Sequence, residues 1–198
     1  MGKRDDTVGP WAVEKLGALR KYLEAYTTVM APQAAIRGYH YIDAFAGRST
    51  WRVRGTEDFI DGSPRVALTI PKPFDSYTFI ELDPRRVEHF RALQREYPDR
   101  DIRVLQGDAN ARLVKDVAPR LPYSSYQRAI AFLDPYTTNL DFDTLRALGA
   151  TRTIEVLVNV PTMAANRRSL RNNAREIPEE DAPHGSVLGR PGLAGGHL

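Results

Sequence analysis

Short apolar runs, each closed by a polar or acidic residue, alternate along this chain with longer segments whose apolar residues recur every three or four positions. The short runs are typical of buried strands, and the longer segments are typical of amphipathic helices. Five strands are predicted, at 39–45, 77–80, 102–106, 129–133 and 154–160. The predicted helices cover 10–28, 64–71, 84–97, 111–117 and 142–148.

Several helix starts carry a polar residue followed by proline. Ser63 stands before Pro64, and Asp83 stands before Pro84. This order predicts a side chain that caps the helix and a proline in its first turn. Asp141 is predicted to cap the helix that follows it.

The alternation of strands and helices predicts an α/β fold with a doubly wound, mostly parallel sheet of about five strands. Right-handed crossovers place the carboxyl ends of all strands at one edge of the sheet. Asp43, Glu81, Asp108 and Asp134 all fall at such ends. A single acid there is usually a helix cap, but four at equivalent positions indicate a shared ligand cleft.

Three parts of the chain are expected. Residues 1–9 are predicted to be a frayed N-terminus, and 10–177 are predicted to form one α/β domain. Residues 178–198 are rich in glycine and proline and are predicted to be a disordered tail. Segment 46–61 is too polar and irregular for a core element, which predicts a long functional or mobile loop.

Composition narrows the functional classes. The 198 residues include no cysteine, which excludes disulfides and thiolate chemistry and favours a cytoplasmic location. No apolar run is long enough to span a membrane. The net charge of +3 permits a nucleic-acid partner without requiring one. No cluster of His, Asp and Glu has metal-ligand spacing, so we predict no metal.

Acids after the first three strands suit a nucleoside ligand. A carboxylate after the second strand can accept hydrogen bonds from both ribose hydroxyls, as in dinucleotide folds. The turn after the first strand lacks the G-x-G-x-x-G pattern and the P-loop lysine, so it does not indicate a pyrophosphate. A ligand with ribose and adenine but no phosphate, S-adenosylmethionine, fits better.

Six motifs, in order, connect the chain to a known family. They are VGPWAVEKLGALRKYL, YIDAFAG, DGSPRVAL, FIELDPRR, GDAN and FLDPY. Together they resemble class I S-adenosylmethionine-dependent methyltransferases and, more specifically, the bacterial three-Cys-motif partner proteins (TcmP). The resemblance covers about 8–162. It implies a Rossmann-like fold, S-adenosylmethionine as cofactor, and a three-cysteine-motif protein encoded nearby as partner.

The resemblance also implies roles for the cofactor-binding residues. Asp43, Phe45 and Gly47 match the first cofactor motif. Glu81 matches the acid that binds the ribose. Asp108, with Asn110 beside it, matches the acid on the adenine side.

The catalytic position of the family falls on Asp134, Pro135 and Tyr136, which look like the D-P-P-Y motif of methyltransferases that act on base amino groups. An exocyclic amine needs acceptors that orient its hydrogens, and the Asp134 carboxylate and Pro135 carbonyl could serve. Tyr136 could stack on a base held out of its helix, or it could belong to the core.

The chain also departs from the family pattern. Members usually read F-A-G-P-G where this chain has Arg48 and Ser49 after Gly47. The full methyltransferase sheet has seven strands, and no candidates follow residue 160, so the C-terminal strands are expected to be missing. Two hypotheses therefore stand: a methyltransferase acting on a base amino group of nucleic acid, or a non-catalytic, methyltransferase-like partner of a three-cysteine-motif protein.

Two groups near the predicted cleft have open interpretations. Trp11 and Lys15 lie four residues apart on one helix face. They could be a packing residue and a solvated charge, or they could form part of the pocket rim. Arg48, Arg52 and Arg54 could contact phosphates of a nucleic acid or could be solvated.

Overall fold

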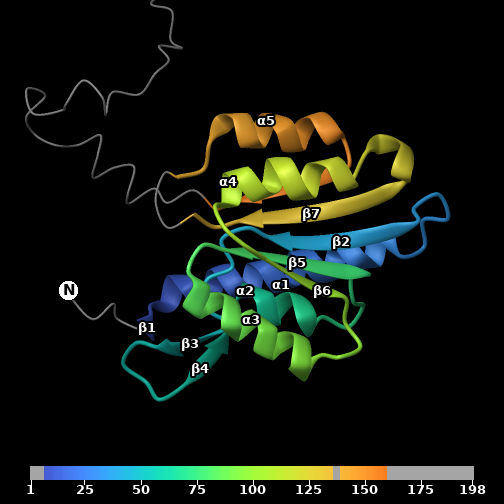
Figure 1. Cartoon of the computed structure of the whole chain (residues 1–198). Coiled ribbons are helices and arrows are strands. Elements are labelled where there is room, and N and C mark those ends of the chain that lie inside the picture. Colours follow the sequence, from blue (N-terminus) through green and yellow to red (C-terminus); the bar gives the residue numbers. More distant parts are fainter. Residues whose placement is uncertain (1–6, 136–138, 160–198) are drawn as a thin grey trace, which may run out of the picture. The chain divides into compact units, whose positions relative to one another are not determined.

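The predicted alternation of strands and helices is present in the computed structural model, which describes residues 7–135 and 139–159 (Figure 1). The main sheet contains β2 (Gly38–Asp43), β5 (Ser76–Glu81), β6 (Ile102–Gln106), β7 (Gln127–Leu133) and β8 (Ile154–Val158). An accessory sheet contains β1 (Thr7–Val8), β3 (Thr50–Val53) and β4 (Phe59–Asp61). The α-helices are α1 (Pro10–Met30), α2 (Ser63–Leu68), α3 (Pro84–Glu96), α4 (Ala109–Arg112) and α5 (Phe142–Thr151). A π-helical turn (Leu113–Val117) and two 3-10 turns (Ala118–Arg120 and Tyr123–Ser125) join α4 to β7.

The main sheet has the order β6-β5-β2-β7-β8, and every neighbouring pair is parallel. Along the chain this is the third, second, first, fourth and fifth strand, which is the doubly wound arrangement. The predicted fold class, an α/β protein with a five-stranded parallel sheet, is therefore confirmed.

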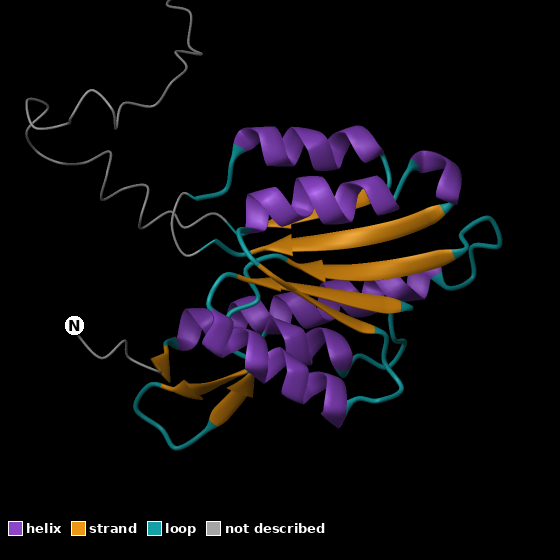
Figure 2. Ribbon diagram, in the orientation of Figure 1, coloured by secondary structure: helices purple, strands orange, loops and turns teal. Residues whose placement is uncertain are grey.

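Helices cover both faces of the main sheet (Figure 2). On one face, α1, α2 and α3 pack against an aromatic surface that includes Tyr41, Tyr77 and Phe79. On the other face, α4, the π-helical turn and α5 pack against smaller side chains such as Ile42 and Ala131. The two cores follow from period-two alternation along the strands, because neighbouring residues point to opposite faces.

Helix α1 shows how the sequence pattern becomes packing. Its buried residues are Leu16, Leu19, Leu23, Tyr26 and Thr27, which lie on the face turned to the sheet. The helix continues to Met30, two residues beyond the prediction, and ends shortly before Pro32, where a proline disfavours the helical conformation of the preceding residue.

Two predictions about irregular segments are wrong. Residues 7 and 8, expected to be frayed, pair in parallel with β3. Segment 46–61, expected to be a loop, contains the antiparallel pair β3 and β4. The reason is that the alternation of half-buried Trp51 and Val53 with exposed Thr50 and Arg52 spans only four residues, too few to stand out in the sequence.

The predicted helix starts at residues 10, 84 and 142 are correct, whereas α2 begins one residue and α4 two residues earlier than predicted. The Asp83 side chain accepts a hydrogen bond from the Arg85 amide, which confirms its capping role. The prediction for Ser63 is wrong by one residue, because Gly62 is the N-cap and Ser63 already lies in α2. Asp141 occupies the N-cap position of α5, but its side chain makes no capping hydrogen bond.

The structure describes the C-terminal part of the chain only as far as residue 159, so predictions beyond that residue are not tested. Strand β8 ends at Val158 rather than at the predicted residue 160. The domain boundary at 177, the tail at 178–198 and the missing C-terminal strands lie outside the described residues. Among the helices that are described, none has both the length and the apolar character needed to cross a bilayer.

Candidate functional site

The crevice predicted by the topology lies between the carboxyl ends of β2 and β7. The chain winds outward from β2 in one direction and then crosses to β7 on its other side, so ligands in this class of sheet bind at that switch point. Asp43 ends β2, and Asp134 follows β7 directly. The register pairs Asp43 with Phe132, two residues before Asp134, so the two acids lie at the same edge of neighbouring strands.

Asp43 is fully buried. The Tyr41 hydroxyl donates to its Oδ2 atom over 3.3 Å. Its Oδ1 atom has no hydrogen bond of good geometry among the described residues, although the Ser63 hydroxyl is close enough to favour the charged form. Burial, reinforced by the charge of Asp134, raises the pKa of Asp43 to about 7. Asp43 is therefore divided between its protonated and ionised forms at neutral pH.

Asp134 is held by two donors that sequence reasoning did not assign to it. The Lys15 ammonium donates to Oδ2, and the Asn159 side-chain amide donates to Oδ1, each over 2.5 Å. Lys15 comes from the first turns of α1, and Asn159 follows β8. These contacts, one to each oxygen, fix the plane of the carboxylate.

Glu81 lies at the end of β5 and is nearly buried. Its Oε1 atom accepts a hydrogen bond from the Asp83 amide over 2.9 Å, which ties it to the start of α3. Its Oε2 atom lies 3.7 Å from an Arg86 nitrogen. The side chain is thus oriented by its own loop, with Oε2 as the less constrained oxygen.

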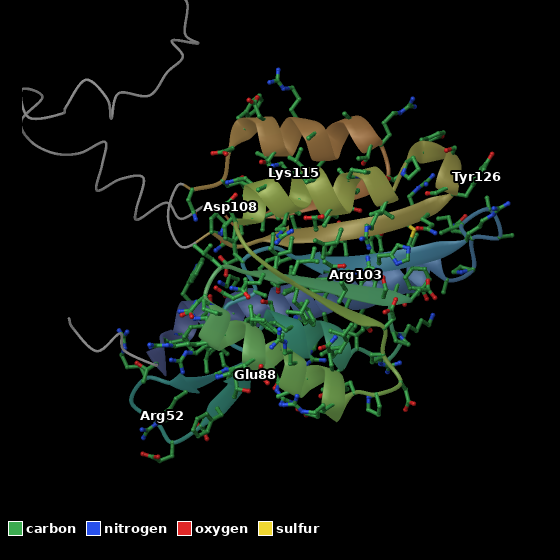
Figure 3. The ribbon with its side chains drawn as sticks, in the orientation of Figure 1. Arg52, Glu88, Arg103, Asp108, Lys115 and Tyr126 are labelled. Carbon is green, nitrogen blue, oxygen red and sulfur yellow. The ribbon has the colours of Figure 1, made fainter. Side chains whose placement is uncertain are left out.

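Asp108 is exposed at the start of α4, where Figure 3 labels it. Its Oδ1 atom accepts a hydrogen bond from the Ala111 amide over 2.9 Å, so it caps the helix. Gly107 before it has φ of 144°, and a Cβ atom there would come within 2.8 Å of the Arg112 side chain. The turn that presents Asp108 therefore needs glycine.

Asn110 is engaged by the protein itself. Its Oδ1 atom accepts hydrogen bonds from the Asp141 amide and the Thr144 hydroxyl, over 3.0 and 2.9 Å. Its amide donates to the Asn139 carbonyl over 2.9 Å. These bonds make Asn110 a bridge between α4 and the start of α5, and leave one amide N–H for any ligand.

The turn after β2 is shaped by Gly47, whose φ of 59° is strained for other residues. Phe45 before it is half-buried against the α4 and α5 core. Neither Arg48 nor Ser49 has a positive φ, so both occupy the positions that were expected to hold proline and glycine without left-handed backbone strain. Gly62 packs so closely that an added Cβ atom would lie 2.0 Å from the Arg48 carbonyl oxygen.

The structure brings Asp43 and Asp134 together and adds Lys15 and Asn159 to them. Lys15 had two open interpretations in the sequence, packing or pocket rim, and its contact with Asp134 favours the rim. Asn159 carried no such signal, because the predicted strand ran to residue 160, and its place after the strand emerges only where β8 ends at Val158. Pro135 is buried next to Asp134. Tyr136 lies outside the described residues.

A cavity of about 400 Å³ lies elsewhere, on the α4 side of the main sheet. His40 is on its floor, with Nδ1 2.9 Å from the Ser76 hydroxyl and Nε2 3.2 Å from the Gln127 Oε1 atom. Arg103, labelled in Figure 3, also lines it. None of the sequence-predicted site residues does, so this cavity is separate from the crevice at the carboxyl edge.

Metal binding finds no support in the described residues, where no group of three or more His, Asp and Glu side chains could hold an ion.

No protein-family model matches the chain. No curated protein matches it either.

Solved structures do resemble the chain. A Legionella pneumophila protein is 15% identical, with a TM-score of 0.51 over 71% of this chain and 66% of its own. Escherichia coli yhhF, described as a candidate methyltransferase, is 15% identical, with a TM-score of 0.45 over 71% and 67%. A candidate methyltransferase from Thermobifida fusca is 18% identical, with a TM-score of 0.45 over 82% and 61%.

The chain thus spans about two-thirds of the length of the solved structures that it matches. At this identity the likeness concerns the fold alone. The likeness to the Legionella pneumophila protein, together with the strand order, shows the class of fold: a doubly wound, Rossmann-like α/β sheet. Membership of the three-Cys-motif partner family and the roles of the site residues stay predictions.

Proposed function

We propose that the protein is an S-adenosylmethionine-dependent methyltransferase that acts on a base amino group of nucleic acid. The observation that carries the proposal is the pairing of Asp43 and Asp134 at the switch point of the sheet, with Asp134 fixed by Lys15 and Asn159. Pro135 beside it supplies a backbone carbonyl at the same edge.

The acids at this edge suit a cationic, ribose-bearing cofactor. Asp43 has a buried oxygen without a good hydrogen bond, and its pKa of about 7 means that a nearby positive charge would ionise it fully. Glu81 offers Oε2 toward ribose hydroxyls, and exposed Asp108 is available on the adenine side. S-adenosylmethionine, when bound, supplies the methyl group.

Asp134 and Pro135 would orient the amine that receives this group. A carboxylate has about four lone-pair positions, so Asp134 can accept a hydrogen bond from the amine while Lys15 and Asn159 keep theirs. Lys15 and Asn159 hold the Asp134 carboxylate in one orientation, so it can serve as an orienting acceptor for the amine. The amine proton released on transfer then passes to solvent.

Calorimetric titration with S-adenosylhomocysteine tests cofactor binding. We expect binding to the wild type and clearly weaker binding to Glu81→Gln, since an amide accepts ribose hydrogen bonds less strongly than a carboxylate. Asp101→Asn, a change at an exposed acid outside the carboxyl edge, is the matched control. Absence of binding at high micromolar ligand would refute the proposal.

Methyl transfer to cellular RNA or DNA tests the role of Asp134. We expect Asp134→Ala to abolish transfer while S-adenosylhomocysteine still binds. Transfer that persists in this variant would remove Asp134 from the mechanism.

A second function is favoured by one observation. Both Asp134 oxygens already have protein donors, which also suits a closed, non-catalytic site. Under this alternative the protein is a methyltransferase-like partner of a three-cysteine-motif protein encoded nearby. Co-purification with that protein, without S-adenosylhomocysteine binding, would favour the alternative.

A further inference from the structure

Trp11 is a large aromatic side chain on the surface beside the candidate site. It lies in the first turn of α1, and 60% of its surface is exposed. The Lys15 ammonium lies 5.0 Å from the centre of its ring, and the same ammonium binds Asp134. One lysine side chain therefore separates an exposed indole from the carboxylate proposed to orient the reacting amine.

The position of Trp11 is outside the packing stripe of its helix. The buried stripe of α1 begins at Leu16, one turn further on, so Trp11 does not contribute to the core. Single exposed apolar residues are common and need no explanation of their own. What distinguishes Trp11 is its connection through Lys15 to Asp134, which places its ring at the edge where the strands end.

The indole is also held in place before any ligand arrives. Gly9 and Pro10 start the helix, and β1 just before them is paired with β3. Lys15 lies over one face of the ring, an arrangement that attracts the cation to the π-system. The exposed 60% of the Trp11 surface is then available to a flat partner.

Basic residues adjoin this end of α1. The Arg54 amide donates to the Val8 carbonyl over 2.8 Å, which joins the accessory sheet to the segment that leads into Trp11. Arg52 points outward from β3, as Figure 3 shows, and its ion pair with Glu57 is exposed. Exposed ion pairs contribute little and exchange readily, so a phosphate can replace Glu57.

We propose that Trp11 forms the substrate-side wall of the site and stacks on a base that neighbours the target base in a single-stranded nucleic acid, with Arg52 contacting its backbone. This inference rests on the proposed function. A flat exposed ring with neighbouring basic side chains is the arrangement by which proteins bind unpaired bases. A base inside a duplex would not reach the ring, so the substrate segment is unpaired or is flipped out.

The chain contains two tryptophans, which allows a direct test. Trp51→Phe leaves Trp11 as the only indole, and this variant is titrated with a 12-nucleotide oligoadenylate while its fluorescence is recorded. We expect quenching that saturates with binding, because stacking brings the base against the indole. Trp11→Phe, which keeps only Trp51, should show little quenching at the same saturation.

Affinity for a dye-labelled oligoadenylate, measured by anisotropy, gives the second readout. We expect Trp11→Ala to weaken binding about tenfold, within the range of one base–aromatic stack, and Trp11→Tyr to restore most of it. Val13→Ala, a change at another exposed apolar residue of the same helix, should have no effect. Arg52→Gln should weaken binding and reduce its salt dependence.

Three results would overturn the inference: no binding of the oligoadenylate, saturated binding without quenching of Trp11, or equal affinities for the wild type and Trp11→Ala. The proposed function is tested separately by S-adenosylhomocysteine calorimetry. If the oligoadenylate stacks on Trp11 but the cofactor analogue does not bind, the inference about Trp11 is supported and the proposed methyltransferase function is refuted.

Discussion

Replacing Asp43 with asparagine removes a carboxyl that the fold disfavours in its charged form. The pKa of Asp43 is raised from 3.8 to about 7, chiefly by burial. Between these two values the unfolded chain has lost the proton and the folded chain has kept it. The folded state therefore loses about 1.4 kcal/mol per pH unit, and this loss ends once the pH exceeds the folded-state pKa.

The raised pKa fixes both the sign and the size of the effect. The contribution of the protonated Asp43 carboxyl to the free energy of unfolding is fully present below pH 4 and is lost as the pH rises toward 7. From pH 5 to pH 8 the loss amounts to roughly 3 kcal/mol. Asp43→Asn cannot titrate, and its amide oxygen can still accept the hydrogen bond from Tyr41. The variant should therefore gain about 3 kcal/mol relative to the wild type over this interval.

Urea denaturation at pH 5 and pH 8 measures this difference. Subtracting the wild type from the variant cancels the titration of all other groups. Asp101→Asn, at an exposed position, controls for the removal of one negative charge. If the difference between Asp43→Asn and the wild type changes by less than about 1 kcal/mol between the two pH values, the buried-carboxyl reasoning is refuted.

Three further substitutions probe packing and hydrogen bonds in the fold, each measured by the free energy of unfolding. Gly62→Ala should cost about 1–3 kcal/mol because its Cβ atom would collide with the Arg48 carbonyl, whereas Gly149→Ala, with open space around it, should be neutral or slightly stabilising. Asn110→Ala should cost about 1–3 kcal/mol because three hydrogen bonds are lost, and a smaller effect would mean that it does not bridge α4 to α5. Thr153→Val should cost about 1–3 kcal/mol because the buried hydroxyl donates to a backbone carbonyl over 2.6 Å, and an unchanged stability would contradict that bond.

Strong local signals let the sequence predict the main sheet. Segment 129–133 is apolar and short and is closed by Asp134, and it lies within β7. The accessory sheet escaped prediction because its strands have only two to four residues, and because the partner of β1 is distant in sequence. Pairing of β1 with β3 is a tertiary effect that no local pattern encodes.

The site was predictable as a set of positions but not as a set of contacts. Acids at strand ends indicated where Asp43 and Asp134 would lie. Spacing alone could not show that Lys15 reaches Asp134, since that depends on how α1 crosses the sheet. It also could not show that Asn110 would be engaged by the start of α5, because this bridge exists only after both helices have packed.

The two hydrogen bonds that hold Asp134, from Lys15 and Asn159, have a consequence for the order in which the site forms. Lys15 and Asp134 are 119 residues apart, and Asn159 lies beyond both. Strands β2, β5 and β6 pair with their neighbours across the single crossovers that connect them. Strand β7 pairs with β2 across a longer segment of chain, which has a greater entropic cost of closure. During synthesis on the ribosome, Asp43, Glu81 and Asp108 are therefore made well before the hydrogen bonds to Asp134 can form. Any function that needs Asp134 held in place begins only when residue 159 has been made and has joined the sheet.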